Sequence, residues 1–368
     1  MIATIAADIA GKTLFWPANI FRKAEPINPE NVREILIIRT AYIGDVVMTL
    51  PMLKPLKDKF PDSRITFLTS TGAKEILVNN PYIDEILIYD PFWFYHISKK
   101  SYIQFFRQLR KKKYDLIIEA RGDIRDILLL ACPAKAKYKV SYGVGGGAYL
   151  LTHVVPYNGL KHKVEYHLDL VRYLGCMANG KEWRIYLTNG EKEAVRKVLI
   201  NEQIDKPFLC AHPGGRLALK RWPIEKCARL YDRIINDFKI TVVLVGSQQE
   251  EVLATEIVKR MRNDPVNLTG KLDLRILSGV LAECVLFIGN DSAPMHIADA
   301  MKTPIVAIFG PSKSRETGPY DKKCLVVQKK FPCRFTCDES VCKHNVYNEC
   351  INAVTTDDVF NAVKEMFK

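Results

Sequence analysis

Residues 284–301 read CVLFIGNDSAPMHIADAM, which is an apolar run followed by a short polar stretch and then a helical pattern. The apolar run Cys284–Ile288 predicts a buried strand, and Gly289 predicts the turn that ends it. Ile297–Met301 continues a helix that Pro304 terminates. Because a buried strand that leads directly into a helix is the repeating unit of parallel sheets, this stretch predicts an α/β fold.

The polar residues of this stretch stand at the start of the predicted helix. Asp291 and Ser292 precede its first turn, where unpaired backbone N–H groups and the helix dipole favour an anion such as phosphate. His296 follows Ser292 by four residues and therefore lies on the same helical face. A serine cap with a packed core histidine would look the same, so this motif alone leaves a nucleotide-sugar site and a plain helix cap both open.

A second strand-to-helix junction carries glycines and a lysine. Phe208–Ala211 predicts a short buried strand, and a helix is predicted over Ile224–Phe238. Between them, Gly214 and Gly215 allow the backbone to approach a pyrophosphate closely, and Lys220 supplies positive charge. An ordinary loop with solvated basic residues is the alternative.

The N-terminal half repeats the alternation of strands and helices. Short apolar runs predict its strands over Glu34–Ile38, Arg64–Leu68, Glu85–Tyr89 and Tyr114–Glu119. Asp45 stands at the first strand-to-helix turn, where it either favours the helix dipole or acts as a base toward an acceptor hydroxyl. Arg121 and Arg125 follow the fourth strand, at the sheet edge where open α/β folds bind ligands.

Four motifs, in order, resemble those of glycosyltransferase family 9, the ADP-heptose:lipopolysaccharide heptosyltransferases. They are ILIIRTAYIGDVV at 35–47, HPGG at 212–215, KRWP at 220–223 and NDSAPMH at 290–296. The resemblance implies a GT-B architecture, in which two Rossmann-like domains face each other across a cleft. It further implies that the N-terminal domain takes the acceptor, that the C-terminal domain takes the nucleotide-heptose, and that transfer needs no divalent metal.

The family's functional residues carry over onto matching positions. Asp45 matches the general base of an inverting transfer, and Thr40 and Gly44 match the loop beside it. The donor-binding residues are expected to be Gly214, Gly215, Lys220, Asp291, Ser292 and His296. The acceptor-side candidates are Thr40, Gly44, Arg121 and Arg125, with Lys161, Lys163 and Glu165 ahead of a predicted helix as further candidates. Ala41–Tyr42 departs from members that carry serines there, which leaves the acceptor contacts open.

The predicted organisation follows from these positions. Its parts are an N-terminal amphipathic extension and linker over 1–30, an acceptor-binding Rossmann-like domain over 31–190, a nucleotide-sugar-binding Rossmann-like domain over 205–350 with a Cys-rich loop at 333–350, and a C-terminal helix over 354–368. A chain of 368 residues with 48% apolar content suffices for two cores.

The formal net charge of +13 favours anionic partners. The basic residues are spread along the chain, as in Arg107–Lys113 and Lys135–Lys139, and no nucleic-acid-binding signature accompanies them. We therefore expect no nucleic acid. The resemblance implies an ADP-heptose donor and a lipid A-core acceptor. With the charge, it predicts a cytoplasmic protein that is peripheral on the anionic inner face of the inner membrane.

No run of about 20 apolar residues predicts a membrane-spanning helix. Residues 1–23 predict an amphipathic helix instead, which either lies in a membrane interface or packs on the protein itself. Asp8 interrupts its apolar face and no basic segment precedes it, so we expect no signal peptide.

Four of the ten cysteines are clustered: Cys333, Cys337, Cys342 and Cys350 follow a C-x3-C-x4-C-x7-C spacing. Four sulfurs this close are candidate ligands of a structural zinc ion or an iron–sulfur cluster. Reduced thiols and disulfides are the alternatives, although an ADP-sugar enzyme works in the reducing cytoplasm, where disulfides are rare.

Other functions remain open at this point. The chain is alternatively a family member with another nucleotide sugar or a non-lipopolysaccharide acceptor, or a non-catalytic nucleotide-binding protein. A non-catalytic protein is disfavoured because Asp45 accompanies the Asp291–His296 motif. A dinucleotide oxidoreductase is disfavoured because Thr40–Asp45 stands where G-x-G-x-x-G would follow the first strand.

Overall fold

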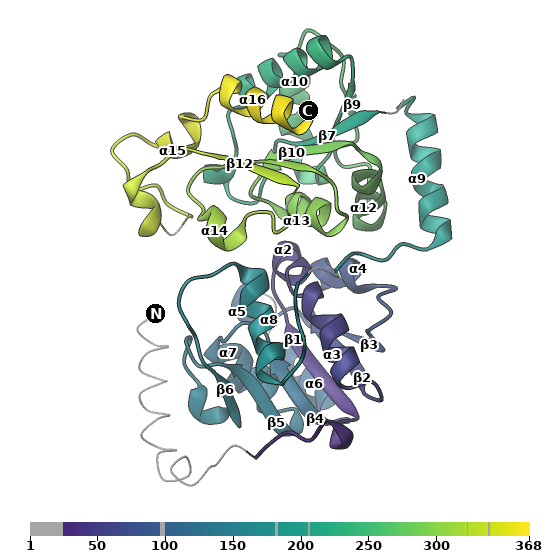
Figure 1. The fold of residues 1–368 in the computed structure, drawn as a ribbon, viewed down its shortest axis with the longest axis vertical. Helices are drawn as coiled ribbons and strands as arrows, with labels where there is room; N and C mark the ends of the chain where they lie inside the picture. The colour runs from purple at the N-terminus through teal and green to yellow at the C-terminus, as the bar shows by residue number, and fades with distance from the viewer. Residues whose placement is uncertain (1–24, 96–99, 181–182, 205–206, 322, 338) are drawn as a thin grey trace. The chain divides into compact units, whose positions relative to one another are not determined.

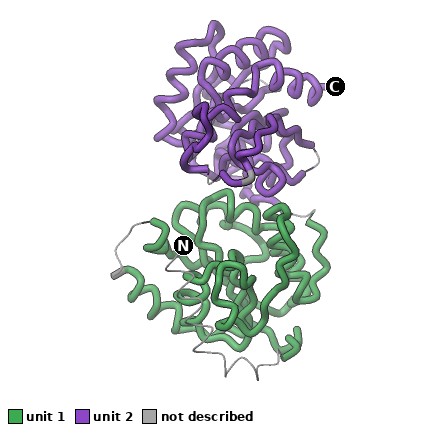
Figure 2. Tube along the Cα trace, turned by 90° about the vertical axis from the view of Figure 1, so that its left-hand side faces the viewer, with its two compact units in different colours: residues 1–183 green, residues 184–368 purple. Residues whose placement is uncertain are grey.

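A computed structural model describes residues 25–95, 100–180, 183–204, 207–321, 323–337 and 339–368. The chain divides into two compact units, residues 1–183 and 184–368 (Figure 2). The amphipathic helix predicted over residues 1–23 lies outside the described residues. Within the described residues, no helix is long and apolar enough to cross a membrane.

The first unit is built on a six-stranded parallel sheet in the order β3-β2-β1-β4-β5-β6 (Figure 1). Its strands are β1 Glu34–Arg39, β2 Arg64–Thr69, β3 Glu85–Ile88, β4 Lys113–Glu119, β5 Lys135–Tyr142 and β6 His153–Val155. Its α-helices are α2 Ile43–Val47, α3 Leu53–Lys59, α4 Lys74–Leu77, α5 Phe92–Tyr95, α6 Lys100–Leu109, α7 Ile124–Asp126 and α8 Lys163–Tyr173.

The second unit repeats the plan with a six-stranded parallel sheet in the order β12-β11-β10-β7-β8-β9 (Figure 1). Its strands are β7 Phe208–His212, β8 Thr241–Leu244, β9 Val266–Asn267, β10 Leu286–Asn290, β11 Ile305–Phe309 and β12 Cys324–Gln328. Its α-helices are α9 Asn189–Asn201, α10 Ile224–Phe238, α11 Glu251–Val258, α12 Leu274–Glu283, α13 Ala293–Ala300, α14 Ser314–Thr317, α15 Glu349–Asn352 and α16 Thr356–Met366.

The central strands are apolar at successive positions because both faces of each sheet are covered. Ile35, Leu36, Ile37 and Ile38 of β1 are all fully buried. Successive side chains of a strand point to opposite faces, so burial of all four requires packing on both sides. The predicted α/β class is thereby confirmed.

In both sheets the chain adds its first three strands outward from the middle toward one edge and its last three outward toward the other edge. In the first unit the direction reverses between β1 and β4, where Ile38 pairs with Glu119. In the second it reverses between β7 and β10, where His212 pairs with Gly289. Ligands of such sheets bind beyond the carboxyl ends of the strands at this switch point. The topology therefore directs attention to the residues that follow these four strands.

The predicted turn at Gly289 was wrong. Strand β10 continues through Gly289 to Asn290, and the chain bends only at Asp291 and Ser292. A Cβ on Gly289 would come within 2.7 Å of the Phe287 ring and 3.2 Å of a backbone oxygen of β7. The glycine is thus required for close packing inside the sheet and not for a turn.

Candidate functional site

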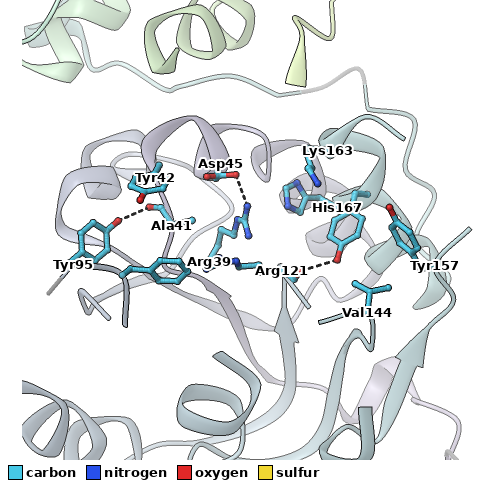
Figure 3. Close-up of a pocket in the computed structure, with 12 residues that line it drawn as sticks. Arg39, Ala41, Tyr42, Asp45, Tyr95, Arg121, Val144, Tyr157, Lys163 and His167 are labelled. Carbon is cyan, nitrogen blue, oxygen red and sulfur yellow. Dashed lines mark hydrogen bonds and ion pairs between the residues drawn. The ribbon is translucent and has the colours of Figure 1, made fainter. Parts of the chain in front are cut away.

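The first unit carries a pocket of about 410 Å³ beyond the carboxyl ends of β1 and β4 (Figure 3). Residues from β1, α2, α5, α8 and the loops after β1, β4, β5 and β6 surround it. They are Arg39, Ala41, Tyr42, Asp45, Phe94, Tyr95, Arg121, Val144, Tyr157, Lys163, Tyr166 and His167. The pocket therefore lies at the switch point of the sheet.

Asp45 lies in the first turn of α2 and lines this pocket with 30% of its side chain exposed. Its Oδ1 accepts a hydrogen bond from Nη2 of Arg39 at 2.8 Å, the ion pair drawn in Figure 3. Among the described residues, this guanidinium is the partner of Oδ1, and Nε of Arg39 is buried without a hydrogen-bond partner. The carboxylate is thus held through one oxygen, which leaves Oδ2 for a ligand.

Two buried carboxyl groups lie near Arg39. Glu119 at the end of β4 accepts hydrogen bonds from the Gly122 amide at 2.7 Å and the Ser141 hydroxyl at 2.6 Å. Burial, with the nearby Asp126 carboxylate, raises the pKa of Glu119 to about 8. Burial also raises the pKa of Asp126 to about 6. Glu119 therefore holds its proton to a higher pH than a solvated glutamate does.

Aromatic and cationic groups form the rest of the pocket. The guanidinium of Arg121 lies 3.9 Å from the centre of the Phe94 ring, and the Tyr166 hydroxyl donates to the Arg121 carbonyl at 2.9 Å. Burial, with the charge of Arg39, lowers the pKa of His167 well below its ordinary value, so this imidazole is neutral. Aromatic faces beside Arg121 and Lys163 suit a ligand that combines hydroxyl groups with negative charge.

The acceptor-side candidates divide between the pocket lining and its surroundings. Arg121 lines the pocket with Asp45, whereas Thr40 and Gly44 are buried residues outside its lining. Arg125 pairs with Asp123 at 2.6 Å and also lies outside the lining. Of the further candidates, Lys163 lines the pocket, Lys161 pairs with Asp169, and Glu165 pairs with Arg172.

In the second unit, Lys220, Asp291 and His296 come together near the switch point. Nζ of Lys220 lies 2.7 Å from Oδ2 of Asp291 and 2.7 Å from Oε2 of Glu339. Burial alone would lower the pKa of Lys220, but Asp291 and Glu339 outweigh it and raise that pKa. Nε2 of His296 lies 4.0 Å from Oδ1 of Asp291. The lysine predicted to meet a diphosphate is thus fully charged.

Ser292 is the N-cap of α13 and belongs to a hydrogen-bonded chain of side chains. Its Oγ lies 3.0 Å from Nδ1 of His212, and Nε2 of His212 lies 3.3 Å from Oε2 of Glu250. Burial opposes ionisation of Glu250, but His212 and Ser247 outweigh it and hold the pKa of Glu250 far below its usual range. His212 and Glu250 were not predicted as site residues, although His212 is the last residue of β7 and Glu250 follows the carboxyl end of β8.

The glycine loop is held by side chains from other elements. Nδ2 of Asn290 donates to the carbonyls of Pro213 and Gly214 at 2.8 and 2.9 Å. The Gly215 amide donates to Oε1 of Glu250 at 2.7 Å. A Cβ on Gly214 would lie 2.0 Å from the same carboxylate oxygen, so a larger residue there would have to displace the Glu250 side chain. In contrast to our expectation, the Gly215 amide already has a carboxylate partner.

The clustered cysteines line one small pocket of about 50 Å³. Cys333, Cys337, Cys342 and Cys350 surround it together with His344. The four cysteines therefore line one site. Across the described residues, however, no three His, Cys, Asp or Glu side chains lie close enough to hold a metal ion. All ten cysteines lie in the described part of the chain as free thiols.

The comparisons with known proteins agree on one family. The model of glycosyltransferase family 9 (heptosyltransferase) matches residues 102–346. Lipopolysaccharide heptosyltransferase 3 of Escherichia coli K12 is 26% identical over 344 residues, which cover 88% of this chain and 95% of the relative.

Solved structures agree with this match. A glycosyltransferase family 9 protein from Veillonella parvula has a TM-score of 0.81 at 22% identity, covering 94% of this chain and 99% of that one. The E. coli ADP-heptose lipopolysaccharide heptosyltransferase II has a TM-score of 0.72 at 21% identity, covering 90% and 98%. These likenesses confirm the predicted GT-B fold class.

The buried Glu119 predicts a pH dependence of stability. A glutamate that ionises near pH 4.3 when unfolded, but near pH 8 when folded, binds more protons in the folded state between these values. Its contribution to the unfolding free energy is therefore full below the unfolded pKa and is lost as the pH rises toward 8. We expect Glu119→Gln to lose less unfolding free energy than the wild type between pH 5 and pH 9.

Urea denaturation of both proteins across this range measures the effect. Glu30→Gln is the matched control, because Glu30 is an exposed carboxylate, and this variant should follow the wild-type dependence. Parallel profiles for Glu119→Gln and the wild type would show that Glu119 is ionised in the folded protein.

Proposed function

Because the chain belongs to glycosyltransferase family 9, we propose that it transfers a heptose from ADP-heptose to the inner core of lipopolysaccharide with inversion at the anomeric carbon. The named relatives that support this donor and acceptor are heptosyltransferases of lipopolysaccharide. The observation that carries the proposal is the position of Asp45. Its carboxylate lines a pocket of aromatic and cationic groups, and one of its oxygens accepts a hydrogen bond from a buried arginine.

Asp45 acts as the general base. Its Oδ2 accepts the proton of the acceptor hydroxyl while the acceptor oxygen attacks the anomeric carbon of the heptose. The bond between that carbon and the diphosphate oxygen breaks, and the electron pair leaves with ADP. Attack on the face opposite the leaving group inverts the configuration. Arg39 acts as a positioning residue, because its Nη2 donates a hydrogen bond to Oδ1 of Asp45 at 2.8 Å and so orients the carboxylate.

The donor binds in the second unit, through Lys220, Asp291, Ser292, His296 and the loop at Gly214 and Gly215. Lys220 and the N-terminus of α13 stabilise the negative charge that develops on the departing diphosphate. A positively charged side chain and a helix N-terminus together supply what a divalent cation provides elsewhere. The proposed transfer is therefore independent of metal.

The acceptor binds in the pocket of the first unit, next to Asp45 and Arg121. The lipid A-core acceptor is anionic, which suits the cationic lining and the net charge of +13. We further propose that the protein works in the cytoplasm, peripherally bound to the anionic inner face of the inner membrane. Another nucleotide sugar or another acceptor is the second candidate, and it is separated from the first by the donor panel described below.

We also propose that Cys333, Cys337, Cys342 and Cys350 are ligands of a structural zinc ion or iron–sulfur cluster. Their common pocket and four sulfur donors support it, although the side chains have to move closer to form a ligand set. Four protein ligands leave no open position, so this site orders the segment between β12 and α16 and takes no part in transfer.

Asp45→Asn tests the base. The variant keeps the shape of the side chain and removes the proton acceptor, so we expect turnover to fall by about three orders of magnitude or more. Donor affinity should stay within about twofold of wild type because Asp45 lies in the other unit. Single-turnover kinetics and calorimetry measure the two quantities. Turnover within about tenfold of wild type would remove Asp45 from the reaction.

Lys220→Ala and His296→Ala test the donor site. We expect both to weaken the affinity for ADP, with a loss of about 1–3 kcal/mol for Lys220 because a charge-assisted contact is removed. Calorimetry on a panel of ADP-, UDP-, GDP- and CMP-sugars gives the preferred donor, which should be ADP-heptose. Unchanged ADP affinity in both variants would place the donor elsewhere, and preference for a different nucleotide would favour the second candidate function.

Elemental analysis of protein purified without chelator tests the cysteine site. We expect about one equivalent of zinc, or iron with inorganic sulfide, and loss of it in Cys337→Ser. Cys132→Ser is the control because Cys132 lies in the first unit. The metal hypothesis would be wrong if the protein held less than about 0.2 equivalents of zinc plus iron and all four thiols of the segment could be alkylated. The cysteines would then be reduced thiols.

A further inference from the structure

Lys220 has a second carboxylate partner that the donor motifs do not account for. Oε2 of Glu339 lies 2.7 Å from Nζ, the same distance as Oδ2 of Asp291. Asp291 precedes α13 and its side chain is 6% exposed, whereas the side chain of Glu339 is 32% exposed and belongs to the Cys-rich segment. One lysine thus bridges the donor motif and the Cys-rich segment.

We propose that Glu339 is a residue of the donor site, where its carboxylate occupies the place on Lys220 that a donor phosphate oxygen takes, and that an entering nucleotide diphosphate displaces it. This inference rests on the proposed role of Lys220 in donor binding. An ammonium group has three N–H donors, and a phosphate oxygen and a carboxylate oxygen bind such a donor with similar charge and geometry. A donor phosphate would be the third anion on Lys220, beside Asp291 and Glu339, and the repulsion among the three favours the departure of one carboxylate.

Glu339 is the partner that leaves, because its attachment is the weaker of the two. Asp291 is fixed at the junction of a buried strand and a helix, next to the N-cap Ser292. Glu339 has a backbone φ of +66°, in the left-handed region that favours glycine. A carboxylate on a more exposed, less favoured stretch of backbone moves at smaller cost than a buried one at the end of a strand.

The Cys-rich segment is packed beside the donor lysine. The amide of Glu339 donates to Sγ of Cys337 at 3.4 Å. Leu219, the residue before Lys220, lines the small pocket together with Cys337 and Cys342. The segment therefore holds Glu339 over the lysine in the free protein. When ADP leaves, the Glu339 carboxylate returns to Lys220 and replaces the lost phosphate contact. This replacement assists product release.

Calorimetry with ADP and with adenosine tests this role in the full-length protein. Glu339→Gln removes the competing charge, so we expect ADP to bind about threefold to tenfold more tightly than to wild type. Adenosine carries no phosphate and should bind equally to both. Glu349→Gln is the matched control, because Glu349 lies in the same segment but pairs with His344 at 3.1 Å. It should bind ADP like the wild type.

A double-mutant cycle identifies the partner. In a Lys220→Met background, the gain from Glu339→Gln should disappear, because the two side chains act on the same phosphate contact. Glu339→Ser should give the same gain as Glu339→Gln, which guards against a local effect of the amide, and circular dichroism confirms that each variant is folded.

The outcomes separate this inference from the donor site itself. If Lys220→Met weakens ADP binding but Glu339→Gln binds ADP no more tightly than wild type, Glu339 is not a competitor and the donor site stands. If Lys220→Met leaves ADP affinity unchanged, Lys220 does not contact the donor. The proposed donor site and the role of Glu339 are then both wrong. An equal gain for adenosine and ADP would show a general change of the site and would also overturn the proposal.

Discussion

Each parallel sheet is wound in two directions from its middle strands, and this topological constraint places both candidate sites. In the first unit the loops after β1 and β4 diverge and leave room for a pocket that contains Asp45 and Arg121. In the second the loops after β7 and β10 bring His212 next to Ser292. Chemistry at the two sites differs because the residues after the strands differ, while the frames that hold them have the same strand order.

Both sites hold a cation of low exposure against carboxylates, since the side chains of Arg39 and Lys220 are 7% and 17% exposed. Burial of a charge is costly unless a partner compensates it, so an arrangement of this kind serves little purpose in a fold that needs only packing. Arg39 pairs with Asp45, and desolvation raises the pKa of the nearby Glu119. Lys220 is matched to Asp291 and Glu339. In each site a charged group is preorganised before any ligand arrives, as electrostatic stabilisation of a transferring group requires.

Local patterns predicted much of this fold, and non-local contacts account for what they missed. Apolar runs gave the strands that became β1, β2, β7 and β10, and helix α10 begins and ends where it was predicted. Strand β5 was missed because Lys135–Lys139 looked like a solvated basic run, although it pairs with β4 along one edge. The motifs identified Asp45, Lys220 and Asp291. They gave no indication of Glu250 or Glu339, whose partners His212 and Lys220 are distant in the chain and become neighbours only through the fold.

We propose that the protein transfers a heptose with inversion, using a base at the switch point of the first unit. This proposal is tested most directly by nuclear magnetic resonance of the product formed from ADP-heptose and a deacylated lipopolysaccharide core. The coupling between the anomeric carbon and its hydrogen gives the configuration of the new bond. The account predicts a single product whose anomeric configuration is opposite to that of the donor. Retention of the donor configuration would contradict it, because one carboxylate acting as a base on the acceptor cannot retain the configuration.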